Sequence, residues 1–404
     1  METVSCDQIV DIIGDKFSNS TEICIVNDSA IGSALALVGA IFLGKSFKVF
    51  PVTNATEGGA ENIRASDLVP DQLRESGQFL KFCFKKFNLD LLDQDIAISF
   101  VSSGTTSEPK VLFKLLSDLA TKVNRSMKND ACWGLVYQID RIAGILVILQ
   151  ALGNRASVVC GDVIRLSDLI GGFIAGGVTC LSLTPSVARN WLMDGQFSEL
   201  MLSQVTLGGE LVDARVLNAL RRTFPNTKLT HIYATSETGA VFSVTDGLHG
   251  FPLDYLARES HRLKIENGTL HVAMVDPLTK GPTWFDTGDK VMVEGERVLF
   301  VGRDINTISV GGVKVNLDVL EDFLADIEMI DDVFVSYKGN SLLGNIVTVE
   351  IVWAEDCDQL SMKQEIHRRI LSKFGSESWC PAQFTTCDQI ERRLSVAGKL
   401  QRKK

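Results

Sequence analysis

Short apolar runs alternate with amphipathic segments across the middle of the chain, from about residue 155 to residue 235. The runs are rich in β-branched residues, which favours strands, and the segments between them repeat apolar residues at helical spacing. Strands that alternate with helices in this way form parallel sheets through β-α-β units. The expected elements are strand 156–160, helix 166–175, strand 178–183, helix 186–194, strand 204–207, helix 213–223 and strand 229–233.

Polar and glycine-rich loops follow three of these expected strands. The carboxyl ends of parallel strands lie at one edge of the sheet, where such folds bind ligands. We therefore expect three loops to converge on a ligand site: Thr184-Pro185-Ser186, Gly208-Gly209-Glu210 and Ala234-Thr235-Ser236-Glu237.

After residue 268 the pattern changes to hairpins, with the runs 291–293 and 298–301 on either side of a turn at 294–296. The C-terminal part then reads as a small α+β unit. Its expected elements are a glycine-rich hairpin ending at 315, helix 317–327, strands 332–337 and 345–353, and helix 360–374.

The pattern as a whole predicts an α/β fold in two domains. The first, residues 1–302, is a large N-terminal domain with parallel β-α-β sheet layers plus β-hairpins. The second, residues 303–404, is a small, mobile α+β domain. The most apolar run, residues 30–44, is too short to cross a bilayer and predicts a buried helix, so we expect no membrane span.

Charge and cysteine usage narrow the class of protein. A net charge of −10 argues against a nucleic-acid partner, since phosphate backbones attract clustered basic residues. The basic C-terminal end, which includes Arg392, Arg393 and Arg402, is expected to be either a solvated tail or a functional segment. Nine cysteines without a C-x-x-C pair fit reduced thiols, and the N-terminus lacks the pattern of a signal peptide. We therefore expect a cytoplasmic protein without structural disulfides.

A run of small polar residues follows the apolar strand expected at 96–101. Hydroxyls, free backbone N–H groups and one lysine in a short loop suit a polyphosphate. The run is not the P-loop of ordinary NTPases, because it leads into another β-prone stretch and not into a helix. Taken alone, such a run is more often a plain loop. It reads Ser102-Ser103-Gly104-Thr105-Thr106-Ser107-Glu108-Pro109-Lys110.

This run resembles the phosphate-binding loop of the acyl-adenylate-forming (AMP-binding) superfamily, which includes acyl-CoA synthetases, luciferases and the adenylation domains of peptide synthetases. Four later motifs follow in the family's order. They are Tyr233-Ala234-Thr235-Ser236-Glu237, similar to Tyr-Gly-x-Thr-Glu; Thr287-Gly288-Asp289; the hinge and glycine turn from Gly302-Arg303 to Gly312; and Gly398-Lys399 of the catalytic lysine loop. The five motifs together identify the chain as a compact member with a shortened N-terminal subdomain.

The resemblance implies roles for the nucleotide site. Lys399 bridges the incoming carboxylate and the α-phosphate, Ser236 reaches the α-phosphate, and Glu237 holds Mg²⁺. Asp289 and Arg303 bind the ribose, although Asp289 alone could be a turn residue and Glu237 alone a surface carboxylate. The remaining nucleotide-binding residues are Ser102, Ser103, Gly104, Thr105, Thr106 and Lys110 at the phosphates and Gly209, Glu210 and Tyr233 at the adenine.

The resemblance also implies which residues form the acyl pocket and the thiol channel. Gln138, Arg141, Thr184 and Gly208 are the expected pocket walls, and Val310, Gly311, Gly312 and Lys314 border the thiol channel. Arg141 stands where the family often has histidine in His-x-x-Gly. It could recognise a second anion on the substrate or pair with Asp140, and we favour the pair. Lys314 could meet a phosphate of a pantetheine arm, but an exposed lysine on a strand is the interpretation that we favour.

The resemblance implies ATP-dependent activation of a small carboxylic acid to acyl-AMP and then thioester formation, by an acid–thiol ligase. The acceptor is CoA in the leading interpretation, an acyl- or aryl-CoA ligase, and the phosphopantetheine of an acyl carrier protein in the second. A non-catalytic nucleotide-binding relic is the alternative of another class, disfavoured because Lys399 is retained.

Several positions depart from the family pattern. Ser107 and Val111 replace glycines of the phosphate loop, and Ile305 and Asn306 replace a charged residue at the hinge. His231, in an expected strand, is interpreted as a core residue. The chain has neither a metalloprotease motif nor a Cys/His cluster in sequence, so we expect no transition-metal site.

Overall fold

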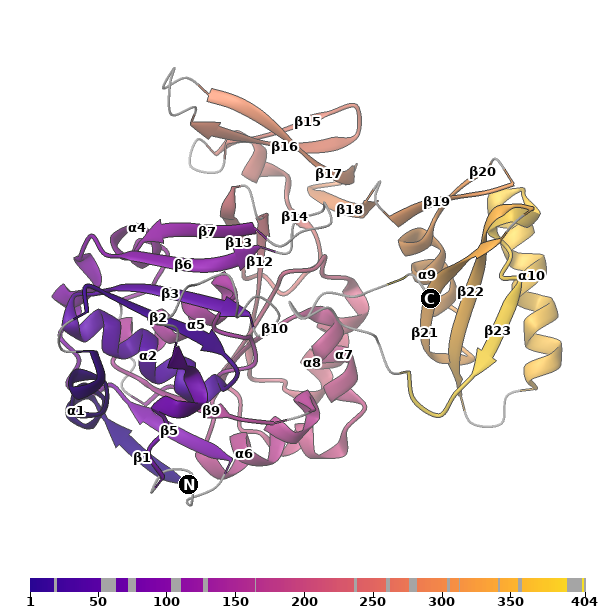
Figure 1. Cartoon of the computed structure of the whole chain (residues 1–404). Helices are drawn as coiled ribbons and strands as arrows, with labels where there is room; N and C mark the ends of the chain where they lie inside the picture. The colour runs from indigo at the N-terminus through magenta and orange to yellow at the C-terminus, as the bar shows by residue number, and fades with distance from the viewer. Residues whose placement is uncertain are drawn as a thin grey trace. The chain divides into compact units, whose positions relative to one another are not determined.

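The computed structural model describes residues 1–17, 20–51, 63–71, 78–102, 110–125, 130–163, 165–235, 238–258, 262–275, 282–303, 306–311, 313–340, 342–354, 358–390 and 402. The chain forms two compact units, residues 1–209 with 215–247, and residues 210–214 with 248–404. The predicted domain boundary at 302–303 falls inside the second unit and stays a prediction. Figure 1 labels the helices and strands.

The first unit contains an eight-stranded sheet in the order β1-β5-β9-β8-β10-β11-β12-β13. The neighbours β9, β8, β10, β11 and β12 pair in parallel, which confirms the predicted β-α-β organisation. The strands are β1 (Glu2–Ser5), β5 (Phe79–Cys83), β8 (Cys132–Gly134), β9 (Ser157–Gly161), β10 (Cys180–Leu183), β11 (Gln204–Gly208), β12 (Lys228–Thr235) and β13 (Gly239–Val244).

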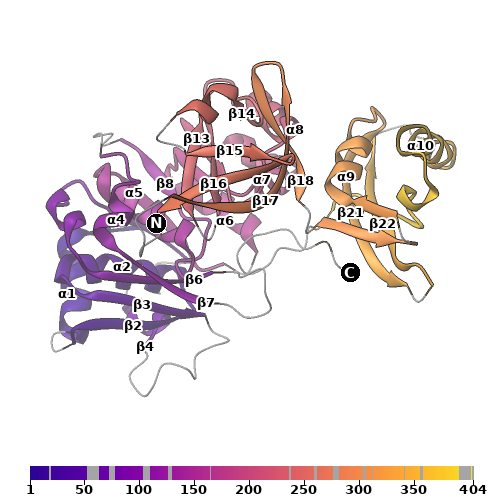
Figure 2. The ribbon, with the colours of Figure 1, turned by 90° about the horizontal axis from the view of Figure 1, so that it is seen from above.

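A second, five-stranded sheet of this unit has the order β4-β2-β3-β6-β7. The last two strands, β6 and β7, form an antiparallel hairpin at its edge, as the views in Figures 1 and 2 agree. The strands are β2 (Glu22–Asn27), β3 (Ser46–Pro51), β4 (Ile63–Arg64), β6 (Ala97–Ser102) and β7 (Lys110–Leu115).

Helix α2 (Ala30–Leu43) confirms the predicted buried helix. It contacts β2 and β3 of one sheet and β9 of the other, so every residue from Ile31 to Ile41 is buried. This explains why its sequence is apolar on all sides and not on a single stripe. Ser29 caps its first turn, and Gly44 ends it in the left-handed conformation with φ of 63°. Asp162 accepts hydrogen bonds from the Ser29 hydroxyl and the Ala30 N–H, both at 2.7 Å, and so ties the end of β9 to α2.

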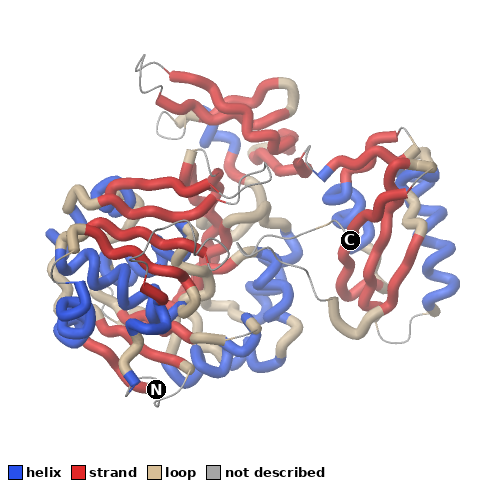
Figure 3. Tube along the Cα trace, in the orientation of Figure 1, coloured by secondary structure: helices blue, strands red, loops and turns tan. Residues whose placement is uncertain are grey.

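The remaining helices of this unit cover the two sheets (Figure 3). The predicted helix 166–175 is divided into a 3₁₀ turn and α6, and the predicted helix 213–223 is present as α8. The α-helices are α1 (Cys6–Phe17), α4 (Leu116–Ala120), α5 (Ile142–Gly153), α6 (Leu169–Gly176), α7 (Pro185–Leu192) and α8 (Ala214–Thr223). The 3₁₀ turns are η2 (Ala65–Leu68), η3 (Leu89–Asp93), η4 (Leu166–Asp168) and η5 (Gly195–Glu199).

The second unit begins with an antiparallel sheet in the order β14-β18-β17-β16-β15. It contains the predicted hairpin, whose strands β17 and β18 are longer than the sequence indicates. The elements are β14 (Phe251–Pro252), η6 (Leu253–Ala257), β15 (Leu263–Glu266), β16 (Thr269–Val275), β17 (Pro282–Glu294) and β18 (Arg297–Arg303).

The C-terminal part has the predicted α+β character. Its sheet has the order β20-β19-β22-β21, with β23 parallel to β22, and the helices α9 and α10 pack on a core that includes Leu320, Leu324, Ile366 and Ile370. The elements are β19 (Thr307–Val310), β20 (Val313–Asn316), α9 (Leu317–Ala325), β21 (Ile330–Asn340), β22 (Gly344–Trp353), α10 (Gln359–Phe374), η8 (Glu377–Trp379) and β23 (Gln383–Thr386).

Across the described residues, all eight cysteines are free thiols. Among the helices described, none is long and apolar enough to cross a membrane.

Candidate nucleotide and acyl-transfer site

The phosphate-loop residues connect two strands of a hairpin. Ser102 ends β6, Lys110 begins β7, and the two are Cα partners across the antiparallel pair. The loop therefore joins strand to strand, which confirms that it is not a strand-to-helix P-loop. Residues 103–109, which include Ser103, Gly104, Thr105 and Thr106, lie outside the described residues.

Three of the expected pocket walls lie at the carboxyl ends of neighbouring parallel strands. Gln138 follows β8, Thr184 follows β10, and Gly208 ends β11; these strands are adjacent in the order β8-β10-β11. The sheet topology therefore places them at one edge, where α/β sheets bind ligands. Sequence reasoning missed Tyr137, whose hydroxyl donates to the Gly208 carbonyl at 3.3 Å and joins the β8 loop to β11.

The Thr184 hydroxyl serves the helix that follows it. It accepts a hydrogen bond from the Val187 N–H at 3.2 Å and so caps α7, and the residue is buried. Its methyl group faces Gly209, where an added Cβ would lie 3.6 Å from Thr184 Cγ2. Gly209 has a φ of 82°, a conformation that favours glycine over other residues. Thr184 can thus form an apolar wall while its oxygen is engaged in capping.

Arg141 forms the ion pair that the sequence favours. Its Nε lies 3.6 Å from a carboxylate oxygen of Asp140, and the two side chains are only 13% and 1% exposed. Burial raises the pKa of the Asp140 carboxyl, and the charge of Arg141 opposes that rise. At Gly144, in the position of the family's glycine, an added Cβ would lie 2.2 Å from the Gln138 carbonyl oxygen, so α5 approaches the β8 loop closely.

Tyr233 and the turn after it are held by β12 and β13. The Tyr233 ring is buried and stacks on Phe242, with centroids 5.1 Å apart. A register shift after Tyr233 bends the strand pair, as β-bulges do next to functional sites. Thr238 donates its N–H to the Thr235 hydroxyl at 3.0 Å and closes the turn. Ser236 and Glu237 lie in this turn, outside the described residues. His231 is buried in β12, as predicted for a core residue.

The two residues expected at the ribose meet across a hairpin. Asp289 of β17 and Arg303 of β18 are Cα partners. Asp289 is fully buried, and its N–H donates to the Thr287 hydroxyl at 3.1 Å. The alternative that Asp289 is a turn residue is wrong, because it lies within the strand Pro282–Glu294. The hairpin register therefore brings together two motifs that are separate in the sequence.

The residues after this hairpin are joined to helix α9. Gly302 has a φ of 127°, and an added Cβ would lie 2.9 Å from the Asn316 side chain. Asn316 caps α9 by accepting from the N–H groups of Asp318 and Val319. Asn306, at the expected hinge, donates to both carboxylate oxygens of Asp318 at 3.1 and 2.9 Å. Ile305 lies outside the described residues.

Arg402, the one residue of the basic end that the structure describes, is not solvated. Its guanidinium is 10% exposed and lies 2.8 Å from Asp318 and 2.5 Å from Glu321. It also donates to the Val335 carbonyl at 2.6 Å, while its own carbonyl accepts from the Tyr337 N–H at 3.1 Å. Arg402 is therefore fixed to α9 and β21. Charge patterning alone could not reveal this, because Glu321 and Asp318 are distant in sequence.

The expected thiol-channel residues lie on the hairpin of β19 and β20. Val310 ends β19, Gly311 has a φ of 56° and donates its N–H to the Leu343 carbonyl, and Lys314 is exposed on β20. The exposure of Lys314 agrees with the plainer interpretation of that residue. Gly312 and Lys399 lie outside the described residues, and the roles of all these residues stay predictions.

Comparison with known proteins places the chain in a family. The sequence model described as "AMP-binding enzyme" matches residues 54–283. D-alanine–D-alanyl carrier protein ligase of Staphylococcus aureus (strain Newman) is 22% identical over an alignment that covers 79% of this chain and 72% of the relative.

Solved structures share the fold at low identity. The anthranilate CoA ligase AuaEII in complex with anthranoyl-AMP is 12% identical, with a TM-score of 0.68 over 98% of this chain and 89% of that chain. The o-succinylbenzoate CoA synthetase MenE from Bacillus subtilis, in complex with its acyl-adenylate intermediate, is 13% identical, with a TM-score of 0.60 over 98% and 90%.

The family match and the shared fold of the solved structures identify the chain as an acyl-adenylate-forming enzyme. The chain belongs to the AMP-binding enzyme family. Formation of an acyl-AMP followed by transfer of the acyl group to a thiol is the activity of this class.

Proposed function

We propose that this chain is an AMP-forming acid–thiol ligase that uses ATP and Mg²⁺ to activate a small carboxylic acid. The observation that carries the proposal is the cross-strand pairing of buried Asp289 with Arg303, directly before the expected hinge. A carboxylate and a guanidinium side by side can accept from and donate to the two hydroxyls of a ribose.

Activation is needed because a carboxylate is a poor acyl donor, whose leaving group would be oxide. In the first step a carboxylate oxygen attacks the α-phosphorus of ATP, the bond to the β-phosphate oxygen breaks, and pyrophosphate leaves. The resulting mixed anhydride with AMP has a good leaving group. In the second step a thiolate attacks the acyl carbon and AMP departs, which gives the thioester.

The chain's own residues align the reactants and neutralise charge. We assign to Lys399 the role of bridging the carboxylate and the α-phosphate, where an ammonium group offsets the charge that develops at the five-coordinate phosphorus. Ser236 donates to an α-phosphate oxygen, and the hydroxyls and N–H groups of the phosphate loop hold the triphosphate. Glu237, in the turn closed by Thr235 and Thr238, would hold Mg²⁺, which supplies charge neutralisation at the departing pyrophosphate when bound.

The thiol step uses the small C-terminal domain in a second orientation. Rotation at residues 302–306 withdraws Lys399 and brings Val310, Gly311 and Gly312 to the acyl-adenylate. Glycines there leave room for a narrow pantetheine arm. Lys314 would meet a phosphate of that arm.

CoA is the proposed acceptor, and a holo-carrier protein is the second candidate. The carrier-protein alternative is favoured by the sequence relative from Staphylococcus aureus, which is a carrier protein ligase by name. The two differ only in what surrounds the same phosphopantetheine thiol, so the shared chemistry is a thioester on that arm.

The first test is acid-dependent exchange of labelled pyrophosphate into ATP, over aryl, short, medium, long and dicarboxylic acids. We expect exchange with at least one acid class, lost in Lys399→Ala and kept in Lys403→Ala, a matched loss of positive charge nearby. AMP binding without exchange for any acid would favour the non-catalytic relic.

The second test separates the acceptors. The enzyme is incubated with ATP, the active acid and either CoA or a holo-carrier protein, and the thioester is detected by mass spectrometry. A thioester on CoA supports the leading proposal. A thioester on the carrier protein alone would replace it with the second candidate.

A further inference from the structure

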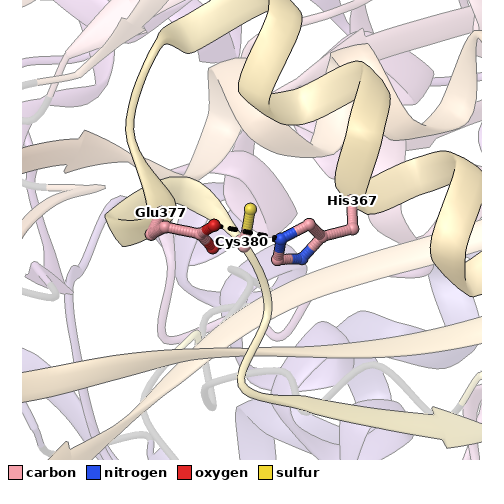
Figure 4. Close-up of side chains that lie close together, drawn as sticks. All are labelled: His367, Glu377 and Cys380. Carbon is pink, nitrogen blue, oxygen red and sulfur yellow. Dashed lines mark hydrogen bonds and ion pairs between the residues drawn. The ribbon is translucent and has the colours of Figure 1, made fainter.

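Three potential metal ligands, none of them assigned to acyl transfer, converge in the C-terminal α+β part. His367 lies on α10, Glu377 begins η8 and Cys380 follows that turn (Figure 4). The Nε2 atom of His367 lies 3.1 Å from one carboxylate oxygen of Glu377 and 3.3 Å from the other. The imidazole nitrogen, a carboxylate oxygen and the thiol sulfur all lie within 4.8 Å of one another.

We propose that His367, Glu377 and Cys380 form a binding site for Zn²⁺, which clasps α10 to the turn that leads into β23. Zinc takes imidazole, carboxylate and thiolate ligands in tetrahedral geometry at bond lengths of about 2.0–2.3 Å. Two ligand atoms on one tetrahedral zinc ion are therefore about 3.4–3.6 Å apart. The observed distances between the ligand atoms, from 3.1 Å for His367 and Glu377 to at most 4.8 Å, are near this value. Small side-chain rotations would bring the atoms to it.

A surface ion pair explains only part of this arrangement. The His367 and Glu377 side chains are 47% and 70% exposed and could pair without any third group. The partly buried thiol of Cys380 has no function in such a pair, yet it lies beside both side chains (Figure 4). A thiolate ligand disfavours Mg²⁺ and Ca²⁺, which prefer oxygen, and selects zinc among abundant divalent ions.

The backbone that carries the ligands is held in place. Gly375, with a φ of 69°, ends α10 and reverses the chain. The Phe374 and Trp379 rings then stack with centroids 4.1 Å apart and planes 2° from parallel. The Cys380 N–H donates to the Glu377 carbonyl at 2.9 Å. A site whose ligands sit on fixed backbone loses less conformational entropy when the metal binds.

Proton balance is simple at this site. Burial, followed by the charge of Glu377, raises the pKa of the Cys380 thiol to about 11, so the metal-free thiol is protonated at neutral pH. Binding forms one sulfur–zinc bond and releases one proton to solvent. A ring nitrogen of His367 and a carboxylate oxygen of Glu377 supply two more ligands, and water completes the fourth position.

The test uses the full-length chain after chelator treatment, with Co²⁺ as the spectroscopic probe and Zn²⁺ as the competitor. We expect one Co²⁺ to bind with tetrahedral d–d bands and a sulfur-to-cobalt charge-transfer band, both removed by Zn²⁺. Cys380→Ser should abolish the charge-transfer band, and His367→Ala should raise the Kd about tenfold or more. The matched control is Cys387→Ser, another partly exposed cysteine of the same sheet, which should bind as the wild type does.

A second measurement avoids any effect of the substitutions on folding. Wild-type protein is alkylated with iodoacetamide with and without Zn²⁺, and the modified peptides are quantified by mass spectrometry. Zinc should slow alkylation of Cys380 and leave Cys387 unchanged. Equal alkylation of Cys380 in both conditions, or an unchanged cobalt spectrum in Cys380→Ser, overturns the proposal. Neither measurement depends on ligase activity. Failure of the zinc proposal would therefore leave the proposed ligase function unaffected.

Discussion

At the scale of single residues, the structure gives the most definite account of Asp289 and its partner. Asp289 is fully buried, and the hairpin register makes it the Cα partner of Arg303. Close contacts also explain why glycine is needed at two positions of the family motifs. Gly302 and Gly144 are required by close contacts with Asn316 and with the Gln138 carbonyl, so their places in the family motifs have a steric cause.

Replacing Asp289 should weaken ATP use and leave the acid site unchanged. Asp289→Asn keeps the shape but removes the charge, and a hydrogen bond to a charged group contributes about 1.5–3 kcal/mol. We expect kcat/KM for ATP to fall about 10- to 100-fold with little change in KM for the acid. Pyrophosphate exchange measures both. Glu294→Gln, an exposed change on the same strand, is the control, and an equal loss there would contradict the assignment.

The buried Asp140 gives a pH prediction. Its folded-state pKa is raised above the usual value of 3.8, so the folded chain binds the proton more tightly than the unfolded chain. The stability it contributes is present below pH 3.8 and is lost as pH rises through the raised pKa. Relative to Asp140→Asn, the wild type should therefore lose unfolding free energy as pH increases across this window.

Asp93 provides a control whose contribution to the unfolding free energy should change with pH in the opposite direction. Its pKa is lowered by a hydrogen bond from Arg125, so its contribution is lost as pH falls. Urea unfolding of wild type, Asp140→Asn and Asp93→Asn compares the two slopes, above pH 3.8 for Asp140 and below pH 3.8 for Asp93. Slopes of the same sign for both aspartates would show that the Asp140 environment is wrongly described.

At the scale of elements, helix α9 connects the hinge to the chain end. Asn306 and Arg402 both bind Asp318 on its first turn, and Arg402 also reaches Glu321 on its next turn. The network joins the segment just before the C-terminal sheet to the segment just after Lys399. We expect it to fix the anchor of the lysine loop.

Removing Arg402 should be costly because it leaves buried carboxylates without their cation. Arg402→Met should lower the unfolding free energy of the second unit by about 3–5 kcal/mol and reduce adenylation. The double variant Arg402→Met/Glu321→Leu should recover part of the stability, since the uncompensated charge is gone. Arg368→Met, which breaks an exposed pair with Glu365, is the control and should change stability little. Urea denaturation measures all three, and equal effects of the two arginine variants would contradict the buried network.

Much of the element scale was open to prediction from sequence. The helix at 30–44 and the parallel strands between 156 and 233 follow from apolarity and β-branched content. The break between η4 and α6 was missed, because its residues continue the helical pattern without a glycine or proline at the junction. The contacts of Arg402 and the cluster around His367 depend on tertiary packing: Gly375 marks the end of α10 in the sequence, but not which side chains the reversal brings together. The roles of the site residues within 103–109, at 236–237 and at 399 stay predictions.

At the scale of the whole molecule, we propose that adenylation and thioester formation use two orientations of one small domain. Lys399 serves only the first orientation, and rotation at the hinge is needed only for the second. A substitution that removes the cation and one that stiffens the hinge should therefore separate the two steps.

The most direct measurement compares both half-reactions in Lys399→Ala and Ile305→Pro. Adenylation is followed by pyrophosphate exchange and thioester formation by supplying synthetic acyl-AMP and the thiol. We predict that Lys399→Ala loses adenylation by about 100-fold or more and keeps thioester formation, while Ile305→Pro shows the reverse. Equal loss of both half-reactions in Lys399→Ala would contradict the central claim.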